Sequence, residues 1–155
     1  MKFTASLCVA TALAVPGFAC ARPVTLNAQL QNYGGNGAYL AVYLTDAAGK
    51  YQKTLWVAGK KSKYYKHLSA WARGSGLAAR EFDGVTGASV GSGKALKITV
   101  DLADVLIDAG YEIRVDSAVE DGRDNPAEVR VPLTKQGSGK AVKGRGYVST
   151  FSYDL

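Results

Sequence analysis

Apolar and polar residues alternate with a period of two in several short segments of this chain, and this alternation is its most constraining feature. Segments 24–31, 95–102 and 111–119 show it most clearly. Such alternation is typical of β-strands that bury one face. Turn-forming residues separate these segments, for example at 46–50 and 120–126. About seven or eight short strands and one helix predict a mainly β fold, an immunoglobulin-like antiparallel β-sandwich.

The order of the segments predicts how the strands are arranged. The first three are expected to form a half-buried antiparallel meander with aromatic residues packing across strands. Pro132 has no amide hydrogen to donate, which predicts an edge position for its strand. The Gly- and Lys-containing stretch 136–146 is expected to be a loop. The expected strands are 24–31, 39–45, 51–57, 95–102, 111–119, 128–133 and 147–153.

The sequence between Ser62 and Gly74 predicts the one short helix. Ser62 is a candidate cap, Gly74 a candidate end, and Tyr64, Leu68 and Trp71 recur at i, i+4 and i+7 on one face. This stripe is expected to cover one end of the sheet core. The lone His67 is expected to be a surface or packing residue and not a catalytic base.

Five basic residues surround this helix with no acidic residue between them. One interpretation is that they are simply solvated. The other is that they form a docking face beside the segment 83–89, which follows closely in the sequence. The residues are Lys60, Lys61, Lys63, Lys66 and Arg73.

Residues 1–21 are predicted to be a secretory signal peptide. Lys2 supplies the positive charge, Phe3 to Val15 the uncharged apolar region, and Ala19-Cys20-Ala21 the cleavage site. An alternative is a lipoprotein signal in which Cys20 is lipidated. Residues 22–155 are then expected to form a single domain, and its net charge falls from +6 to about +5 with the loss of Lys2. A moderately basic exported protein favours acidic partners, and nucleic acid is a poor candidate.

Both cysteines, Cys8 and Cys20, lie in this signal segment, and the chain has one histidine. The mature chain therefore offers no thiolate zinc site, iron–sulfur cluster, c-type haem attachment or multi-histidine metal site. No metal is expected. Redox chemistry on this chain would need a cofactor that binds without soft ligands.

The segment Asp83-Gly84-Val85-Thr86-Gly87-Ala88-Ser89 is the strongest candidate for a functional site. Ser89 offers a hydroxyl acceptor for a phosphoryl group, and the small Gly87 and Ala88 allow the backbone to enter a tight active site. Asp83 and Thr86 are expected to hold the loop through side chain to backbone hydrogen bonds. The alternative is a Gly-rich hairpin loop in which Asp83-Gly84 makes a turn and Gly87 has positive φ.

The run D-x-x-T-G-A-S resembles the acceptor motif D-x-x-[S/T]-G-A-[T/S] of periplasmic flavin transferases. That resemblance implies that FMN is moved from FAD onto Ser89 as a phosphodiester. The final residue of such motifs is usually Thr, so Ser89 is a departure from the pattern.

The mature chain as a whole is also similar to a known family. The runs Y-L-A-V-Y-L-T-D-A-A-G-K, K-T-L-W-V, K-Y-Y-K-H-L-S-A-W and D-G-V-T-G-A-S resemble periplasmic proteins of unknown function. These are distantly similar to the immunoglobulin-like part of flagellar hook-capping proteins. The family is associated with PepSY-type membrane proteins and flavin transferases. The resemblance implies a periplasmic location and electron transfer with a PepSY-type membrane redox protein.

Three functions are compared on these residues. The preferred one is a covalent FMN carrier that is modified by an enzyme and is not itself an enzyme; Tyr64, Tyr65 or Trp71 could stack on the flavin ring. The alternative is a non-catalytic module that binds a protein or a glycan through loops of the sandwich. A conventional enzyme is disfavoured because no nucleophile–base pair is evident; Asp83 near Ser89 is better explained as turn chemistry.

Overall fold

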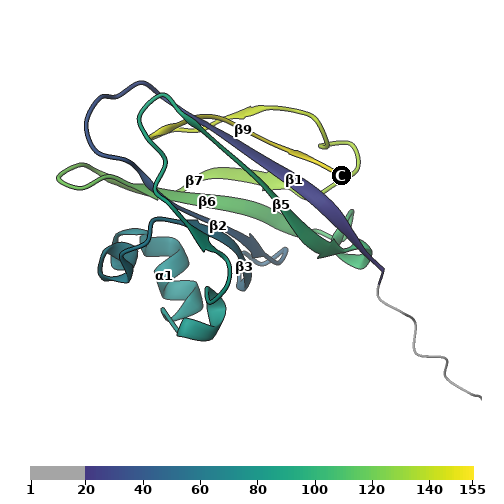
Figure 1. The fold of residues 1–155 in the computed structure, drawn as a ribbon. Helices are drawn as coiled ribbons and strands as arrows, with labels where there is room; N and C mark the ends of the chain where they lie inside the picture. The colour runs from purple at the N-terminus through teal and green to yellow at the C-terminus, as the bar shows by residue number, and fades with distance from the viewer. Residues whose placement is uncertain (1–19) are drawn as a thin grey trace, which may run out of the picture.

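The computed structural model describes residues 20–155, which fold as two β-sheets packed face to face (Figure 1). One sheet has the strand order β5-β1-β9-β8 and the other β4-β3-β2-β6-β7. The mainly β sandwich predicted from the alternation is confirmed. The strands are β1 (Ala21–Leu30), β2 (Tyr39–Thr45), β3 (Tyr51–Ala58), β4 (Thr86–Gly87), β5 (Ala95–Ala103), β6 (Glu112–Ala118), β7 (Asp124–Pro132), β8 (Val142–Lys143) and β9 (Val148–Asp154).

The helical segments are short and lie between strands. They are η1 (Ser62–His67), α1 (Ser69–Ser75), η2 (Ala79–Glu81) and η3 (Asp104–Leu106). Within residues 20–155, none of these helices has the length and hydropathy that a membrane span requires. The prediction of a signal peptide over 1–21 falls almost wholly outside the described residues.

The interior of the sandwich follows the alternation seen in the sequence. In β1, every second residue from Val24 to Leu30 is buried. Leu40 of β2 and Ile113 of β6 from the opposite sheet, and Phe151 of the neighbouring strand β9, complete the same core. Burying each such side chain contributes about 1.5–3 kcal/mol, which is why the period-two pattern determines the fold class.

The predicted meander of the first three strands is wrong, because β1 belongs to the other sheet. β1 pairs with β5 and β9, whereas β2 pairs with β3 and β6. β2 is buried on both faces: Leu40 and Val42 face the sandwich core, and Ala41 and Tyr43 face α1. A strand covered on both sides takes the centre of a sheet, so the chain crosses from one sheet to the other between β1 and β2.

The end of the chain differs from expectation in two ways. β7 is an edge strand, as Pro132 predicted, but it begins at Asp124 inside the expected 120–126 turn. A β-bulge around Ala127, whose φ is +43°, lets the strand accommodate Pro126. The expected loop 136–146 contains the short strand β8, which pairs with β9.

The predicted helix exists but is broken and is capped from a distance. Leu68 (φ −83°, ψ 69°) separates η1 from α1, and Ser62 makes no capping hydrogen bond. The first amides of α1, those of Ala70 and Trp71, instead donate to the carboxylate of Asp116 in β6, at 2.8 Å each. α1 continues past Gly74 and ends at Gly76, which has left-handed φ.

The apolar stripe of this helical region also differs by one residue from the prediction. Tyr65, Leu68 and Trp71 are buried against the outer face of β2 and β3, whereas Tyr64 stays partly exposed. The break at Leu68 changes the rotation of the helix, so the i, i+4, i+7 pattern that began at Tyr64 does not apply across it.

Candidate functional site

The segment 83–90 runs along the edge of the five-stranded sheet and then crosses the end of β3. Gly84, at φ +79°, completes a turn after η2. β4 then runs parallel to β3, with Val57 N donating to Val85 O at 2.9 Å and Gly59 N donating to Gly87 O at 2.8 Å. The hairpin-loop alternative is right in its turn at Asp83-Gly84 and wrong in the rest: Thr86 and Gly87 form a short parallel edge strand, and Gly87 has no positive φ.

Gly87 is required by packing and not by its φ, which is not positive. A Cβ at this position would lie 2.7 Å from Cζ2 of Trp56, closer than any real contact. The ring of Trp56 thus lies directly against the backbone of the motif. The sequence predicted a small residue here for access to an enzyme; the structure adds a reason within the fold.

Ser89 is exposed to solvent at the point where the segment reaches β2. The next residue, Val90, pairs with Ala38 through two backbone hydrogen bonds of 2.7 and 2.9 Å, which fixes the end of the segment. The Ser89 Oγ lies 2.8 Å from where a Cβ of Gly37 would be, so a glycine keeps its surroundings open. Among residues 20–155 no side chain or backbone group hydrogen-bonds to this hydroxyl.

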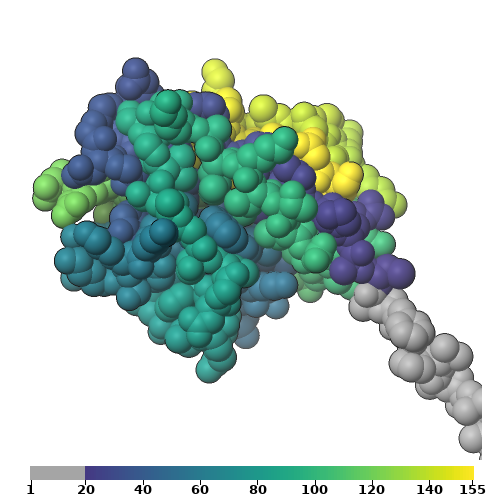
Figure 2. Space-filling view, in the orientation of Figure 1, coloured from purple at the N-terminus to yellow at the C-terminus, as the bar shows by residue number. Residues whose placement is uncertain are grey.

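The other motif residues share this exposed edge. Asp83, Thr86 and Ala88 are exposed, and Figure 2 shows the teal segment that contains them on the near face of the molecule. In the described part of the chain, the side chains of Asp83 and Thr86 make no hydrogen bond, contrary to expectation. Backbone bonds hold the turn instead, such as Asp83 N to Ala79 O at 2.8 Å.

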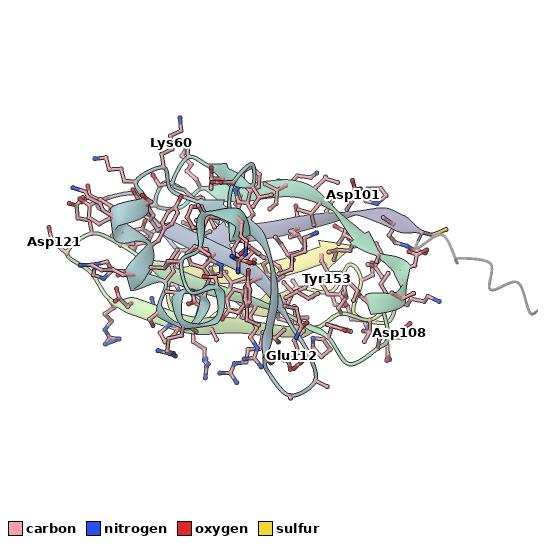
Figure 3. The ribbon with its side chains drawn as sticks, turned by 90° about the horizontal axis from the view of Figure 1, so that it is seen from below. Lys60, Asp101, Asp108, Glu112, Asp121 and Tyr153 are labelled. Carbon is pink, nitrogen blue, oxygen red and sulfur yellow. The ribbon has the colours of Figure 1, made fainter. Side chains whose placement is uncertain are left out.

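The motif lies beside part of the basic run. Because Gly59 is hydrogen-bonded to Gly87, the next residues, Lys60 and Lys61, emerge next to β4. Both are exposed, and Figure 3 shows Lys60 at the periphery of the molecule. The start of the basic run thus follows a residue that is hydrogen-bonded to Gly87, two positions before Ser89.

A cavity of about 320 Å³ opens at the same end of β2. Tyr39 and Tyr64 form an aromatic wall, with ring centroids 5.5 Å apart in an edge arrangement. The Tyr64 hydroxyl donates to Glu120 Oε1 at 3.0 Å, and His67 Nδ1 lies 3.1 Å from Asp124 Oδ2. The lining residues are Tyr39, Tyr64, His67, Ala118, Val119, Glu120, Asp121, Gly122 and Asp124.

No local sequence pattern indicates this cavity, because its walls come from β2, η1 and the β6–β7 turn. Of the aromatic residues expected as flavin contacts, Tyr65 and Trp71 are buried, at 3% and 0% exposure, and cannot stack on a ligand. Tyr64 is partly exposed and lines the cavity. His67 lies at the surface, as predicted, and pairs with Asp124.

A second cleft, of about 440 Å³, lies between α1 and the strands β6 and β7. Arg73, Arg114 and Arg130 line it, and Arg114 and Arg130 are directly opposite each other across the two strands. Glu112 binds Arg114 at 2.8 Å. Burial raises the pKa of Tyr51, which also lines the cleft, to about 12, so this phenol stays protonated at neutral pH. With Arg114 paired to Glu112, Arg73 and Arg130 give the cleft a net positive charge.

Over residues 20–155, His, Cys, Asp and Glu side chains do not gather in any group of three or more that could hold a metal ion.

A family model described as "Predicted periplasmic protein (DUF2271)" matches residues 21–150, from the first residue of β1 into β9. No curated protein and no solved structure matches the chain significantly.

Proposed function

The chain belongs to this DUF2271 family of predicted periplasmic proteins, and on that premise we propose that it is a periplasmic carrier of covalently attached FMN. The attachment point is Ser89, through a phosphodiester. In this function the chain is the substrate of a flavin transferase and not an enzyme. A PepSY-type membrane redox protein is its proposed electron-transfer partner.

The exposed Ser89 hydroxyl carries the proposal. An acceptor hydroxyl must enter the active site of another enzyme, so it needs exposure and small neighbours. Ser89 is exposed, Gly37 leaves its surroundings open, and Ala88 precedes it with a single methyl group. The anchors on either side, at Gly87 and Val90, are backbone hydrogen bonds, so the side chain is presented without being used by the fold.

FAD is the FMN donor in the covalent step. The Ser89 Oγ–phosphorus bond forms, the pyrophosphate bond of FAD breaks, and AMP leaves with the bonding electron pair. The hydroxyl proton passes to a base of the transferase. Lys60 and Lys61 lie beside the segment and stabilise the negative charge of the phosphodiester that results.

FMN supplies reversible electron transfer when it is attached. The chain supplies the anchor, the position at a sheet edge and the charged surroundings. The absence of cysteine from the chain beyond residue 20 is consistent with this division of roles.

The test is the intact mass of the chain exported to a periplasm that contains a flavin transferase. The wild type is expected to gain one FMN, Ser89→Ala to gain none, and Ser89→Thr to be modified at least as well as the wild type. Ser92→Ala is the control, because it removes a hydroxyl three residues beyond Ser89 that lies outside the motif and accepts a hydrogen bond from Gly34 N at 2.9 Å. An unmodified wild type, from cells that flavinylate another acceptor, would contradict the proposal.

A second candidate is a binding module for an anionic polysaccharide, and the arginine cleft favours it. Like charges directly opposite on neighbouring strands, as at Arg114 and Arg130, are destabilising. Glu112 compensates Arg114, and an anion in the cleft would compensate Arg73 and Arg130. Retention on a sulfated dextran matrix tests this. Arg73→Gln with Arg130→Gln should lower retention far more than Lys97→Gln with Lys135→Gln, which removes the same charge elsewhere. Equal retention of the two pairs would exclude the module.

A further inference from the structure

We propose that the aromatic cavity formed by Tyr39, Tyr64, His67 and the β6–β7 turn receives the isoalloxazine ring of an FMN attached to Ser89. The inference rests on the proposed carrier function and extends it. It assigns a binding site for the ring to residues that lie outside the acceptor motif.

The cavity lies within reach of the anchor. Ser89 Oγ is next to Gly37, and Tyr39, which lines the cavity, follows Gly37 by two residues. Two residues of extended strand span about 7 Å, which a ribityl phosphate arm of five carbons and a phosphate can bridge. The β6–β7 turn and the chain entering β2 lie at one end of the molecule (Figure 1), and Asp121 marks that end in Figure 3.

A glycine lies next to Ser89 and another lies next to Tyr39. Gly37 presents no side chain beside Ser89, and Gly59 presents none beside the ring of Tyr39. A Cβ on Gly59 would overlap that ring, so the glycine allows Tyr39 to lie flat over the end of β3. Tyr65, held by its hydroxyl on Gly59 O at 2.7 Å, supports Tyr39 from the side.

The cavity suits a flat aromatic ring. Its volume of about 320 Å³ is at the lower end of the roughly 300–1,000 Å³ that small-molecule sites occupy. Tyr39 and Tyr64 offer aromatic surface, and Ala118 and Val119 offer aliphatic surface. Tyr64 is oriented in advance by its hydrogen bond to Glu120, so little conformational entropy is lost when a ring packs against it.

The charged residues around the cavity favour binding of the neutral ring of the cofactor over binding of its phosphate. Glu120, Asp121 and Asp124 surround the cavity and would repel a free phosphate or another anion. Lys60 and Lys61 lie beside the motif, where the phosphate of the attached cofactor would be. This separation of charge places the phosphodiester on the basic side and a neutral aromatic ring in the acidic, aromatic cavity.

The test uses the full chain carrying FMN, first checked by intact mass, and reads flavin fluorescence. Tyrosine in contact with the isoalloxazine quenches its emission, so the wild type should be dimmer than free FMN. Tyr64→Leu is expected to shift the docked-to-free ratio of the ring by roughly two- to tenfold and to raise emission accordingly. Tyr111→Leu, a partly exposed tyrosine outside the cavity, is the control and should match the wild type.

Iodide quenching of the wild type gives a second readout that does not depend on any variant folding. A docked ring is expected to be shielded from iodide relative to free FMN. An attached FMN that is as bright and as accessible as free FMN, and is unchanged in Tyr64→Leu, overturns this inference and leaves the carrier function intact. A chain that gains no FMN overturns the carrier function and, with it, the assignment of the cavity to the flavin ring.

Discussion

At the scale of single residues, Gly37 controls the space around the acceptor hydroxyl. Its φ is not in the left-handed region, so the backbone tolerates alanine. The new Cβ would lie 2.8 Å from Ser89 Oγ and crowd it. Displacing a reacting atom by a fraction of an ångström is costly, and we expect Gly37→Ala to lower the rate of FMN incorporation by about tenfold. The ratio of modified to unmodified mass over time measures it.

The control for this prediction is Gly91→Ala, two residues beyond Ser89. Its added Cβ meets only Lys94 Cγ at 3.3 Å, the middle of a flexible side chain, and its φ is likewise not positive. Incorporation should stay close to that of the wild type. Equal rates for Gly37→Ala and Gly91→Ala would show that the space beside Gly37 does not limit access to the hydroxyl.

The sequence predicted Ser89 because its motif is contiguous, so the residue types and their spacing are visible without a fold. It could not predict Gly37 or Trp56 as neighbours of the motif, because both come from parts of the chain distant in sequence. The expected hydrogen bonds of Asp83 and Thr86 were wrong for a related reason. Pairing with β3 already fixes the backbone there, and these side chains remain in solvent.

At the scale of elements, α1 is held to the sheet by one buried carboxylate. Asp116 in β6 accepts hydrogen bonds from the Tyr43 hydroxyl and from the amides of Ala70, Trp71 and Ala127, at 2.7 to 2.9 Å. Asp116→Ala leaves all these donors unpaired in the interior. We expect it to lower the free energy of unfolding by about 3–5 kcal/mol, measured by urea denaturation.

Asp101→Ala is the matched control, because Asp101 is an exposed aspartate on β5. Its effect should stay within about 0.5 kcal/mol. The near-ultraviolet signal of Trp71 adds a local readout, since this ring is fully buried under α1. If Asp116→Ala retained that signal and unfolded at the same urea concentration as Asp101→Ala, the carboxylate would not be what holds the helix.

The position of the helix was predictable and its construction was not. The run from Tyr64 to Trp71 has helical periodicity, but its cap comes from a residue 45 positions away from Trp71. No local pattern indicates such a partner. The start of β7 was missed for a similar reason: its bulge at Ala127 is stabilised by a hydrogen bond to Asp116, which belongs to another strand.

At the scale of the whole molecule, period-two alternation determined the sandwich but not the division of strands between its sheets. Alternation indicates that a strand buries one face, but it does not indicate which strand pairs with it. β1 and β2 are neighbours in sequence and lie in different sheets. The candidate site depends on this division, because the residues that lead into β2, Gly37 and Ala38, meet Ser89 and Val90.

Hydrogen bonds accepted by Glu128 connect the two sheets at one edge. This buried residue of β7 accepts hydrogen bonds from the Ser117 hydroxyl in β6 and from the amides of Gly146 and Val148. Val148 begins β9 of the other sheet. Burial raises the pKa of the Glu128 carboxyl, and the hydrogen bonds that it accepts oppose this only in part.

A raised pKa in the folded state has a defined consequence for stability. An unfolded glutamate has a pKa of about 4.3. Between that value and the higher pKa of folded Glu128, the folded chain binds more protons than the unfolded chain. The free energy of unfolding therefore falls as pH rises through this interval, and the loss is absent below the unfolded pKa. Ionisation of Glu128 should thus weaken the connection between the sheets and lower the free energy of unfolding.

Glu128→Gln removes this titration and keeps an oxygen acceptor for Val148. We expect the difference in free energy of unfolding, wild type minus Glu128→Gln, to become smaller as pH rises from about 4 to 7. Urea denaturation of both proteins at a series of pH values measures it, and the shared titrating groups cancel in the difference. A difference that grows with pH would mean that the hydrogen bonds to the ionised carboxylate contribute more than burial of its charge costs. The ionised form of Glu128 would then be the one that connects the sheets.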